Sequence, residues 1–202
     1  MKQVEDRETT EILKIAQECL SVPGDFIELG CYEGDTSLLL AEILEKHNNR
    51  GVSEVSYAPE SQKELWIYDS FEGLPAKTAE DESVAGKDFQ EGVLFVTKRE
   101  VKQRFLRANL KVPHIKKAWF ADLTDEDLPK QISFAFLDGD LYQSIKDSFK
   151  AIDGKMSPES VIIVHDYNNP ELPGVTKAVD EWLSRTKHKL AIKDSLAIIK
   201  VY

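Results

Sequence analysis

Cysteine is scarce in this sequence, which holds only two, Cys19 and Cys31, among 202 residues. Two cysteines cannot build the disulfide framework on which many small secreted domains depend. No signal peptide precedes the first charged residues, so we expect a cytoplasmic protein. We interpret Cys31 as a small buried filler, with a nucleophilic role as the alternative.

Long apolar runs and excess positive charge are also missing. No segment approaches the roughly 20 apolar residues that cross a bilayer, so we expect no membrane anchor. The 26 Lys and Arg residues are outnumbered by 36 Asp and Glu, which gives a net charge of -10. A phosphate backbone repels such a surface, and we do not expect nucleic acid as a partner. The length suits one domain over residues 1–202.

Short apolar runs alternate with segments of helical periodicity along the chain. Strands are predicted at residues 25–29, 65–69, 115–120, 132–137, 161–164, 190–192 and 195–199, and helices at 5–20, 38–47, 97–110, 141–152 and 175–182. This alternation predicts an α/β fold with a Rossmann-like, seven-stranded, mostly parallel sheet, an antiparallel last strand and helices on both faces.

Two long polar segments interrupt this pattern. Residues 48–63 are polar and contain glycine, and we expect a loop there. Residues 76–96 are rich in charged and small residues. A segment of this length without regular structure inside a compact domain is usually functional or disordered. We therefore predict a mobile lid over residues 76–96.

Acidic side chains follow two neighbouring strands of the predicted sheet. Asp138 and Asp140 come directly after one buried strand, and His165 and Asp166 follow the next. Ligands bind beyond the carboxyl ends of parallel strands, so Asp138, His165 and Asp166 are predicted to meet there. Oxygen and imidazole ligands suit a divalent cation such as Mg²⁺ or Mn²⁺. The alternative is that Asp138 and Asp140 cap the next helix and that His165 is a hydrogen-bonded rim residue. We adopt this alternative for Asp140 alone, which we predict to be the N-cap of the helix.

The first two predicted strands end in residues that suit a cofactor. Gly30 and Gly34 allow the chain to turn tightly and to approach a ligand closely. Glu28 is placed where a strand-end carboxylate meets a cationic group. Asp69 ends the second strand, where an acid accepts hydrogen bonds from ribose hydroxyls. The alternative for Asp69 is a turn cap.

Several motifs carry a family resemblance. Glu-x-Gly-x-x-x-Gly at residues 28–34 resembles the S-adenosylmethionine-binding turn of class I methyltransferases. Leu-Asp-Gly-Asp-x-Tyr-x-Ser (137–144), Val-Ile-Ile-Val-His-Asp-Tyr (161–167), Asp-Ser-Phe-Glu-Gly-Leu-Pro (69–75) and Ala-Trp-Phe-Ala-Asp (118–122) resemble the metal-dependent O-methyltransferases of the macrocin and mycinamicin type. Those enzymes methylate sugar hydroxyls of macrolide antibiotics. The similarity runs from about residue 26 to residue 182.

This resemblance implies S-adenosylmethionine and a divalent cation as cofactors, and a small hydroxylated molecule, sugar-like or another natural product, as methyl acceptor. It implies that Asp138 is both metal ligand and general base, with His165 and Asp166 as the other ligands. The residues implied for the cofactor pocket are Glu28, Gly30, Gly34, Thr36, Asp69 and Ser70, with Asp122 near the adenine.

The sequence departs from the family pattern at several points. The family usually has two aspartates where this chain has His165 and Asp166, which puts the identity of the metal in doubt and would suit a transition metal. Glu33 stands where the family commonly has a basic residue. The long N-terminal region of the antibiotic enzymes is lacking, so a macrolide acceptor is not implied. The oligomeric state, including a homo-oligomer, stays open.

Two other functions remain as alternatives. The first is a protein that binds S-adenosylmethionine without turnover. The second is a phosphohydrolase of the haloacid dehalogenase type, in which two aspartates spaced like Asp138 and Asp140 act as nucleophile and proton donor. Such enzymes carry the pair on the first strand of the core, whereas here it follows a later one.

Overall fold

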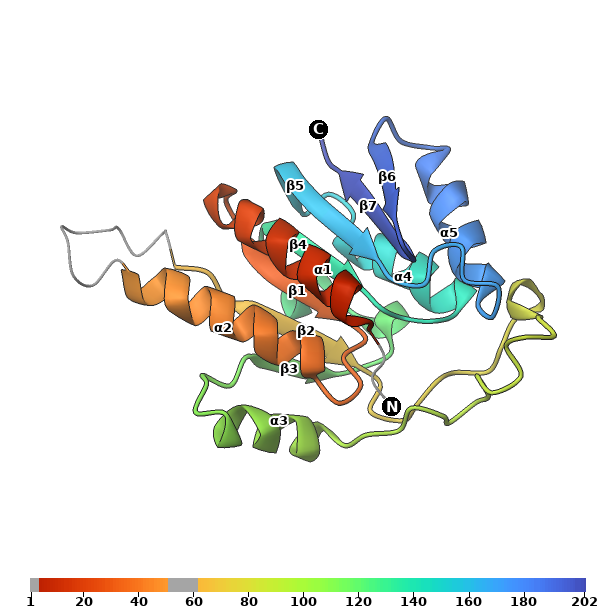
Figure 1. Cartoon of the computed structure of the whole chain (residues 1–202), viewed down its shortest axis with the longest axis horizontal. Coiled ribbons are helices and arrows are strands. Elements are labelled where there is room, and N and C mark those ends of the chain that lie inside the picture. The colour runs from red at the N-terminus through yellow and green to blue at the C-terminus, as the bar shows by residue number, and fades with distance from the viewer. Residues whose placement is uncertain (1–3, 51–61) are drawn as a thin grey trace.

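The computed structural model describes residues 4–50 and 62–202, which form one mixed sheet between two layers of helices (Figure 1). The strands are β1 (Asp25–Leu29), β2 (Leu65–Asp69), β3 (His114–Lys117), β4 (Ile132–Leu137), β5 (Met156–Val164), β6 (Lys189–Lys193) and β7 (Leu196–Lys200). Their order in the sheet is β3-β2-β1-β4-β5-β7-β6. Pairing is parallel from β3 to β5, and β7 runs antiparallel to both of its neighbours. The predicted fold class is confirmed.

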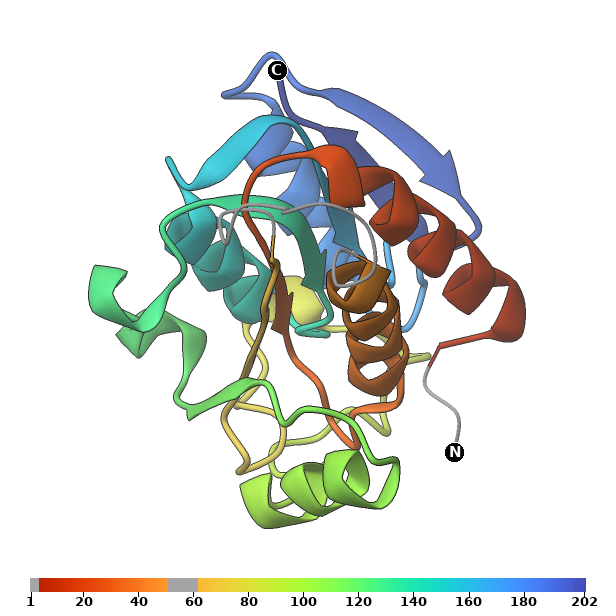
Figure 2. The same ribbon diagram turned by 90° about the vertical axis from the view of Figure 1, so that its left-hand side faces the viewer.

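Helices cover both faces of the sheet (Figure 2). The helices are α1 (Asp6–Glu18), α2 (Asp35–Arg50), α3 (Lys98–Arg107), α4 (Tyr142–Ile152) and α5 (Pro173–Leu183), with short 3₁₀ turns η1 (Cys19–Ser21), η3 (Ala79–Asp81), η4 (Phe120–Asp122) and η5 (Asp125–Asp127). Side chains of α1, α2 and α3 pack on one face, and those of α4 and α5 pack on the other. No helix in the described ranges is long and apolar enough to cross a membrane.

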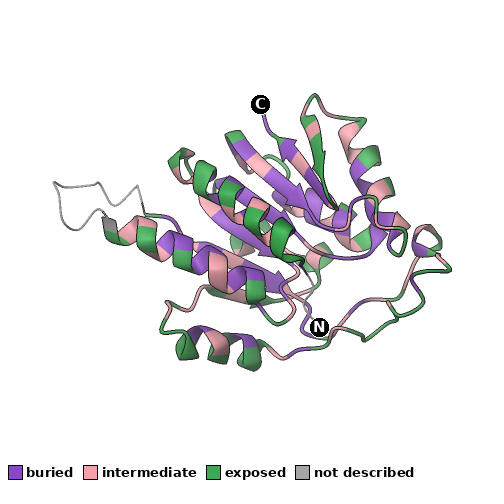
Figure 3. Cartoon of the chain, in the orientation of Figure 1, coloured by how far each residue is buried: buried purple, intermediate pink, exposed green. Residues whose placement is uncertain are grey.

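The core is centred on β4, whose six residues are all buried (Figure 3). Successive side chains of a strand point to opposite faces. Phe134 and Phe136 therefore pack toward α1, α2 and α3, while Ala135 and Leu137 pack toward α4 and α5. Complete burial of a phenylalanine contributes roughly 1.5–3 kcal/mol relative to exposure. The apolar packing on both faces fixes where β4 ends, and so where Asp138 begins.

Some predicted boundaries differ from the structure. The loop predicted at residues 48–63 begins later, because α2 continues through Arg50, and residues 51–61 lie outside the described ranges. The strand predicted at 115–120 ends at Lys117. β3 pairs only with β2 among the described strands, and the last residue of β2, Asp69, lies opposite Lys117. Without a partner beyond that point, Phe120–Asp122 closes into η4.

The predicted N-cap role of Asp140 is wrong. The N-cap residue of α4 is Leu141, whose apolar side chain makes no capping hydrogen bond. The amide of Tyr142 instead donates a hydrogen bond of 2.7 Å to Oδ1 of Asp81, a buried residue of η3. A carboxylate from a distant segment therefore satisfies one of the amides that a helix start leaves free.

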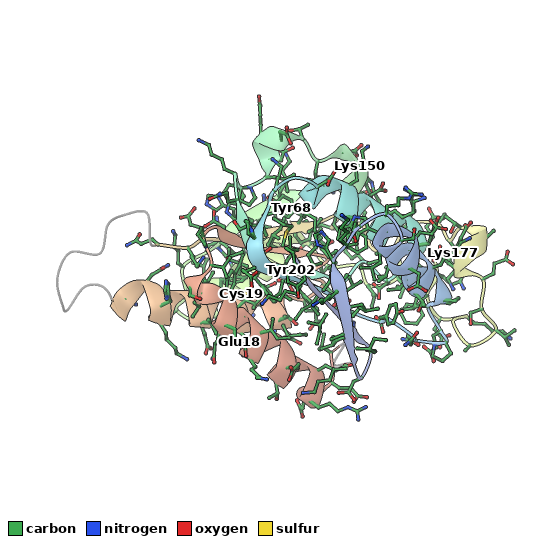
Figure 4. All side chains as sticks on the ribbon, turned by 90° about the horizontal axis from the view of Figure 1, so that it is seen from above. Glu18, Cys19, Tyr68, Lys150, Lys177 and Tyr202 are labelled. Atoms are coloured by element: carbon green, nitrogen blue, oxygen red, sulfur yellow. The ribbon has the colours of Figure 1, made fainter. Side chains whose placement is uncertain are left out.

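Residues 76–96 run from the end of β2 to the side of α5 and back toward α3 (Figure 1). Ser83 Oγ donates a hydrogen bond of 2.6 Å to the carbonyl of Pro170. Lys177 of α5 lies beside this segment (Figure 4), with Nζ 3.2 Å from Oε1 of Glu80. The segment is therefore tied to the layer of α4 and α5, and its mobility as a lid stays a prediction.

Candidate active site

Gly30 joins the two halves of the site. It follows β1 with φ +91°, a conformation that favours glycine, and its amide donates to the carbonyl of Tyr68 at 2.9 Å. A Cβ at this position would lie 2.0 Å from the carbonyl oxygen of Asp138. The turn after β1 therefore packs directly against the end of β4, and only a glycine fits between them.

A cavity of about 370 Å³ lies over this contact. Its lining includes six of the residues predicted from sequence: Glu28, Gly30, Thr36, Asp69, Ser70 and Asp138. Gly34 and Asp122 are outside the lining. Gly34 instead allows the backbone to turn, with φ +83°. The residues just before Asp122 form one wall of the cavity.

Aromatic side chains in that wall were not predicted. Trp119 and Phe120 line the cavity between the end of β3 and η4, and Tyr32 lines it from the turn after β1. The motif at 118–122 contains both Trp119 and Phe120, and their flat apolar faces were the available signal for a nucleobase or sulfonium site.

Glu28 is a buried acid at the base of the cavity. Its carboxylate accepts a hydrogen bond from Ser37 Oγ. Burial raises the pKa of Glu28 to about 8. The side chain thus holds a proton near neutral pH, and a cationic ligand group placed beside it would favour the ionised form.

The carboxylate of Asp69 accepts hydrogen bonds from backbone amides in the turn after β1 and in the turn after β2. Its Oδ2 accepts from the amides of Cys31 and Tyr32 at 3.0 and 3.2 Å, and its Oδ1 accepts from Phe71 at 2.7 Å. Asp69 is therefore a turn cap, as the alternative interpretation held, and it also lines the cavity. Burial raises the pKa of the Cys31 thiol well above its usual value, which suits a filler rather than a nucleophile.

The ends of β4 and β5 bring Asp138, His165 and Asp166 together. Nδ1 of His165 lies 3.0 Å from Oδ1 of Asp138 and 3.0 Å from Oδ2 of Asp166. Asp166 has φ +61°. This departure from extended backbone breaks the alternation of the strand, so that two consecutive side chains face the same cluster. The predicted convergence of these three side chains is present.

A third acid completes the surroundings of His165. Nε2 of His165 lies 3.5 Å from Oε2 of Glu8 in α1. Burial lowers the pKa of His165, but the charges of Asp138 and the hydrogen bonds to the surrounding acids outweigh it, and the pKa is raised well above its usual value. The hydrogen bond with His165 is also the main reason that the pKa of Glu8 falls to about 2.

The cluster fits a divalent cation. One ligand atom from each of Asp138, His165 and Asp166 can be chosen so that all lie within 4.8 Å of one another. An octahedral cation with bonds of about 2.1 Å places adjacent ligand atoms about 3 Å apart, which is the spacing around Nδ1. Hydrogen bonds explain the same spacing, so the geometry is compatible with a cation without requiring one.

Asp140 faces the cavity two residues after Asp138. Within the described ranges, no group donates a hydrogen bond to its carboxylate, although the residue is buried. Burial, together with the charge of Asp138, raises the pKa of Asp140 well above its usual value. Sequence reasoning assigned Asp140 to the helix cap and so missed its place in the site.

Comparison with known proteins agrees with this arrangement. The model of the macrocin-O-methyltransferase (TylF) family matches residues 8–201, which is nearly the whole chain. The chain belongs to this family. The phosphohydrolase alternative is thereby set aside, since the family's motifs account for the acids that suggested it.

The chain is similar in sequence to two O-methyltransferases from Streptomyces. It is 28% identical over 151 residues to the 8-demethyl-8-(2,3-dimethoxy-alpha-L-rhamnosyl)-tetracenomycin-C 4'-O-methyltransferase of Streptomyces olivaceus, covering 72% of this chain and 54% of the relative. It is 29% identical over 185 residues to demethyldecarbamoylnovobiocin O-methyltransferase of Streptomyces niveus, covering 89% and 64%. The chain thus spans about half to two thirds of the length of these relatives.

A solved structure shares the fold of this family member. The O-methyltransferase NovP superposes with a TM-score of 0.74 at 25% sequence identity, covering 94% of this chain and 78% of that one.

Proposed function

We propose that this chain transfers a methyl group from S-adenosylmethionine to a hydroxyl of a small, sugar-bearing acceptor, with the help of a divalent cation. The observation that carries the proposal is the position of Asp138. Its side chain belongs both to the cavity lined by the glycine turn and to the cluster with His165 and Asp166. A methyl donor and an acceptor hydroxyl held on either side of Asp138 would be adjacent, as in-line transfer requires.

The donor half of the proposal rests on the cavity lining. A glycine turn beside a buried acid suits the amino acid part of the cofactor, with Glu28 as the group that meets its ammonium. Trp119 and Phe120 offer apolar faces to the adenine. Asp69 keeps acceptor capacity for ribose hydroxyls, because a carboxylate has about four lone-pair sites and three amides are bound.

The acceptor half rests on the acids. Asp138, His165 and Asp166 would hold the cation, which when bound lowers the pKa of a substrate hydroxyl and orients it. The carboxylates at the end of β4 take the proton of that hydroxyl, with Asp138 as the base that the family resemblance implies and Asp140 as a second acceptor that faces the cavity. In the transfer, the bond from carbon to the sulfonium sulfur breaks as the bond from carbon to oxygen forms.

The names of the relatives support the proposed acceptor class. One of them is the 4'-O-methyltransferase of a tetracenomycin that bears a rhamnosyl group, and another is the O-methyltransferase of demethyldecarbamoylnovobiocin. We therefore propose a hydroxyl on a deoxysugar or on a small glycosylated natural product. Residues 76–96, which adjoin the cavity through Thr78 and Leu94, would close over that acceptor.

Cofactor binding and methyl transfer test the proposal in two steps. S-adenosylhomocysteine should raise the melting temperature, since a ligand at 100 times its Kd adds about 2.7 kcal/mol to stability. Radiolabelled methyl from S-adenosylmethionine should then appear in a panel of rhamnosides and nucleotide-linked deoxysugars, supplied with Mg²⁺ or Mn²⁺.

Two variants sharpen this test. Asp138→Asn should lose transfer while retaining S-adenosylhomocysteine binding, and Asp153→Asn, which alters an exposed acid after α4, should behave as the wild type. Absence of any effect of S-adenosylhomocysteine on melting would contradict the proposal. Binding without transfer to any acceptor would favour a protein that binds the cofactor without turnover.

A further inference from the structure

Glu8 is held in one orientation by four contacts, the first of which is a hydrogen bond of 3.2 Å that the amide of Glu5 donates to its Oε2. Its Oε1 accepts hydrogen bonds from the amide and the hydroxyl of Ser195, at 3.0 and 2.6 Å, and its Oε2 lies 3.5 Å from Nε2 of His165. Glu8 and His165 are each 5% exposed. A buried carboxylate of the first helix is therefore fixed beside the imidazole ring by the residue that precedes β7.

This arrangement distinguishes the two ring nitrogens of His165. When a cation takes one ring nitrogen of a histidine, the other nitrogen keeps the hydrogen, and a carboxylate that faces this second nitrogen accepts the hydrogen bond. Nδ1 faces Asp138 and Asp166, the two other residues of the cluster. Nε2 faces only Glu8 among the side chains that contact the ring through hydrogen bonds in the described part of the chain. A cation held at the cluster would take the place of the Nδ1 hydrogen, and Nε2–H would then donate to Glu8.

We propose that Glu8 is a positioning residue that presents Nδ1 of His165 as a nitrogen ligand, and that the resulting site selects a transition metal over Mg²⁺. The inference rests on the cation site of the proposed function and adds the metal class and the residue that sets it. Imidazole nitrogen favours ions such as Co²⁺, Ni²⁺ and Zn²⁺, whereas Mg²⁺ prefers oxygen ligands and retains its waters. A carboxylate that orients a ligating histidine typically contributes 10–100-fold to metal affinity.

Co²⁺ is the probe, because it reports on its ligands without requiring turnover. Titration of the full chain, with calorimetry and visible absorption, should give tight Co²⁺ binding that excess Mg²⁺ displaces poorly. Proton NMR of the Co²⁺-loaded protein in water should show a strongly shifted, exchangeable resonance from the Nε2–H of a coordinated histidine. That resonance should vanish in D₂O and should be absent from His165→Asp, whose preference should move toward Mg²⁺.

Variants of two acids in α1 isolate the role of Glu8. Glu8→Gln should weaken Co²⁺ binding by about 10–100-fold and broaden the shifted resonance through faster exchange. Glu11→Gln makes the same change of charge in the same helix at a side chain that pairs with Lys193, and it should leave Co²⁺ affinity within about twofold of wild type. Ser195→Ala, which removes one hydrogen bond to Glu8 without a change of charge, should produce a smaller loss and serves if Glu8→Gln fails to fold.

A double-mutant cycle separates positioning from simple attraction between charges. In the His165→Asp background no ring N–H remains for Glu8 to hold, so Glu8→Gln should cost less than in the wild type. Equal costs in both backgrounds, equal affinity for Mg²⁺ and Co²⁺, or no Co²⁺ binding would each overturn the inference. For each of these outcomes, S-adenosylhomocysteine binding and methyl transfer with Mg²⁺ would be measured on the same preparations. If both are retained, the proposed function stands although the inference about Glu8 and the metal is overturned.

Discussion

Oδ1 of Asp81 accepts a hydrogen bond of 2.7 Å from the backbone amide of Tyr142, although 61 residues separate them. The other carboxylate oxygen accepts from the amide and hydroxyl of Thr78, so the segment after β2 is folded around the same acid. The start of α4 and the segment of residues 76–96 are thereby joined. The acids at the end of β4 lie directly before that helix, so this contact also helps to position the candidate site.

Asp81→Ala should destabilise the protein by about 1–3 kcal/mol, because it removes a cap and leaves a buried amide without a partner. Urea unfolding measures the loss. Glu82→Ala alters the next residue, which is exposed, and should cost less than about 0.5 kcal/mol. Equal effects of the two changes would contradict the assigned cap.

Gly174→Ala tests the same contact from the other side. A Cβ at Gly174 would lie 2.0 Å from Oδ1 of Asp81. The added methyl should displace the acid and so lower stability by an amount similar to the loss in Asp81→Ala. In the Asp81→Ala background the glycine change should cost less, since the contact with Oδ1 is gone and the one with the Tyr142 Cβ at 2.8 Å remains. A double-mutant cycle in urea would detect this coupling.

Gly30→Ala should be far more damaging than Gly92→Ala. Both glycines have positive φ, at +91° and +80°, so both substitutions carry a backbone cost of roughly 1–2 kcal/mol. Only at Gly30 does the new Cβ meet backbone, 2.0 Å from the oxygen of Asp138, while Gly92 has open space. We expect Gly30→Ala to cost more than about 3 kcal/mol or to prevent folding, as measured by thermal and urea unfolding. Similar losses at both positions would contradict the tight contact.

Glu28 should make stability fall as pH rises. Burial raises its pKa to about 8 from a usual value of 4.5, so between these pH values the folded chain holds a proton that the unfolded chain releases. The linkage slope is therefore negative over this window, at most about 1.4 kcal/mol per pH unit, and it ends above about pH 8. The difference in unfolding free energy between wild type and Glu28→Gln, measured from pH 5 to 9, should follow this course. A flat difference would show that Glu28 titrates normally.

Trp119 should report cofactor binding through its fluorescence. It lines the cavity, whereas Trp66 stacks on His114 and Trp182 stacks on Phe149. S-adenosylhomocysteine should change the emission of the wild type and of Trp182→Phe, but not that of Trp119→Phe. Trp119→Ala should also weaken binding by about 10-fold, in line with 1–3 kcal/mol for a base stacked on an aromatic ring. An unchanged signal in Trp119→Phe would place the adenine elsewhere.

Asp140→Asn separates proton transfer from cation binding. The carboxylate lines the cavity but stands outside the cluster of Asp138, His165 and Asp166. We expect turnover to fall at least about 100-fold, while Co²⁺ and S-adenosylhomocysteine affinities stay within about threefold. Full turnover in this variant would show that Asp140 takes no part in the proton transfer.

The fold and the central cluster could be predicted because their signals are local. Short apolar runs identified the strands, and the rule that parallel strands end at one edge brought Asp138, His165 and Asp166 together before any coordinates. The predicted capping role of Asp140 was wrong because sequence rules for helix caps consider only residues adjacent to the helix. Asp140 has φ +59° and its side chain faces the cavity, while the helix start is satisfied by Asp81.

Contacts between distant parts of the chain were beyond prediction. Glu8 and His165 are 157 residues apart, and an acid in the first turn of an amphipathic helix has an ordinary explanation in the helix dipole. Its burial depends on how α1 packs over the sheet beside the start of β7, which no local pattern encodes. The aromatic wall could not be predicted for a different reason, since Trp119 and Phe120 lie in irregular chain after β3, where no periodicity shows which way their side chains point.

The contact of Gly30 with the carbonyl of Asp138 sets a distance by main chain alone. Side-chain rotamers around the rim can rearrange without altering the separation between the two turns. Under the proposed function, substitutions in residues 76–96 would therefore change the choice of acceptor while the spacing of the reacting groups stays constant. Acceptor choice and reaction geometry would then be separable traits of this architecture.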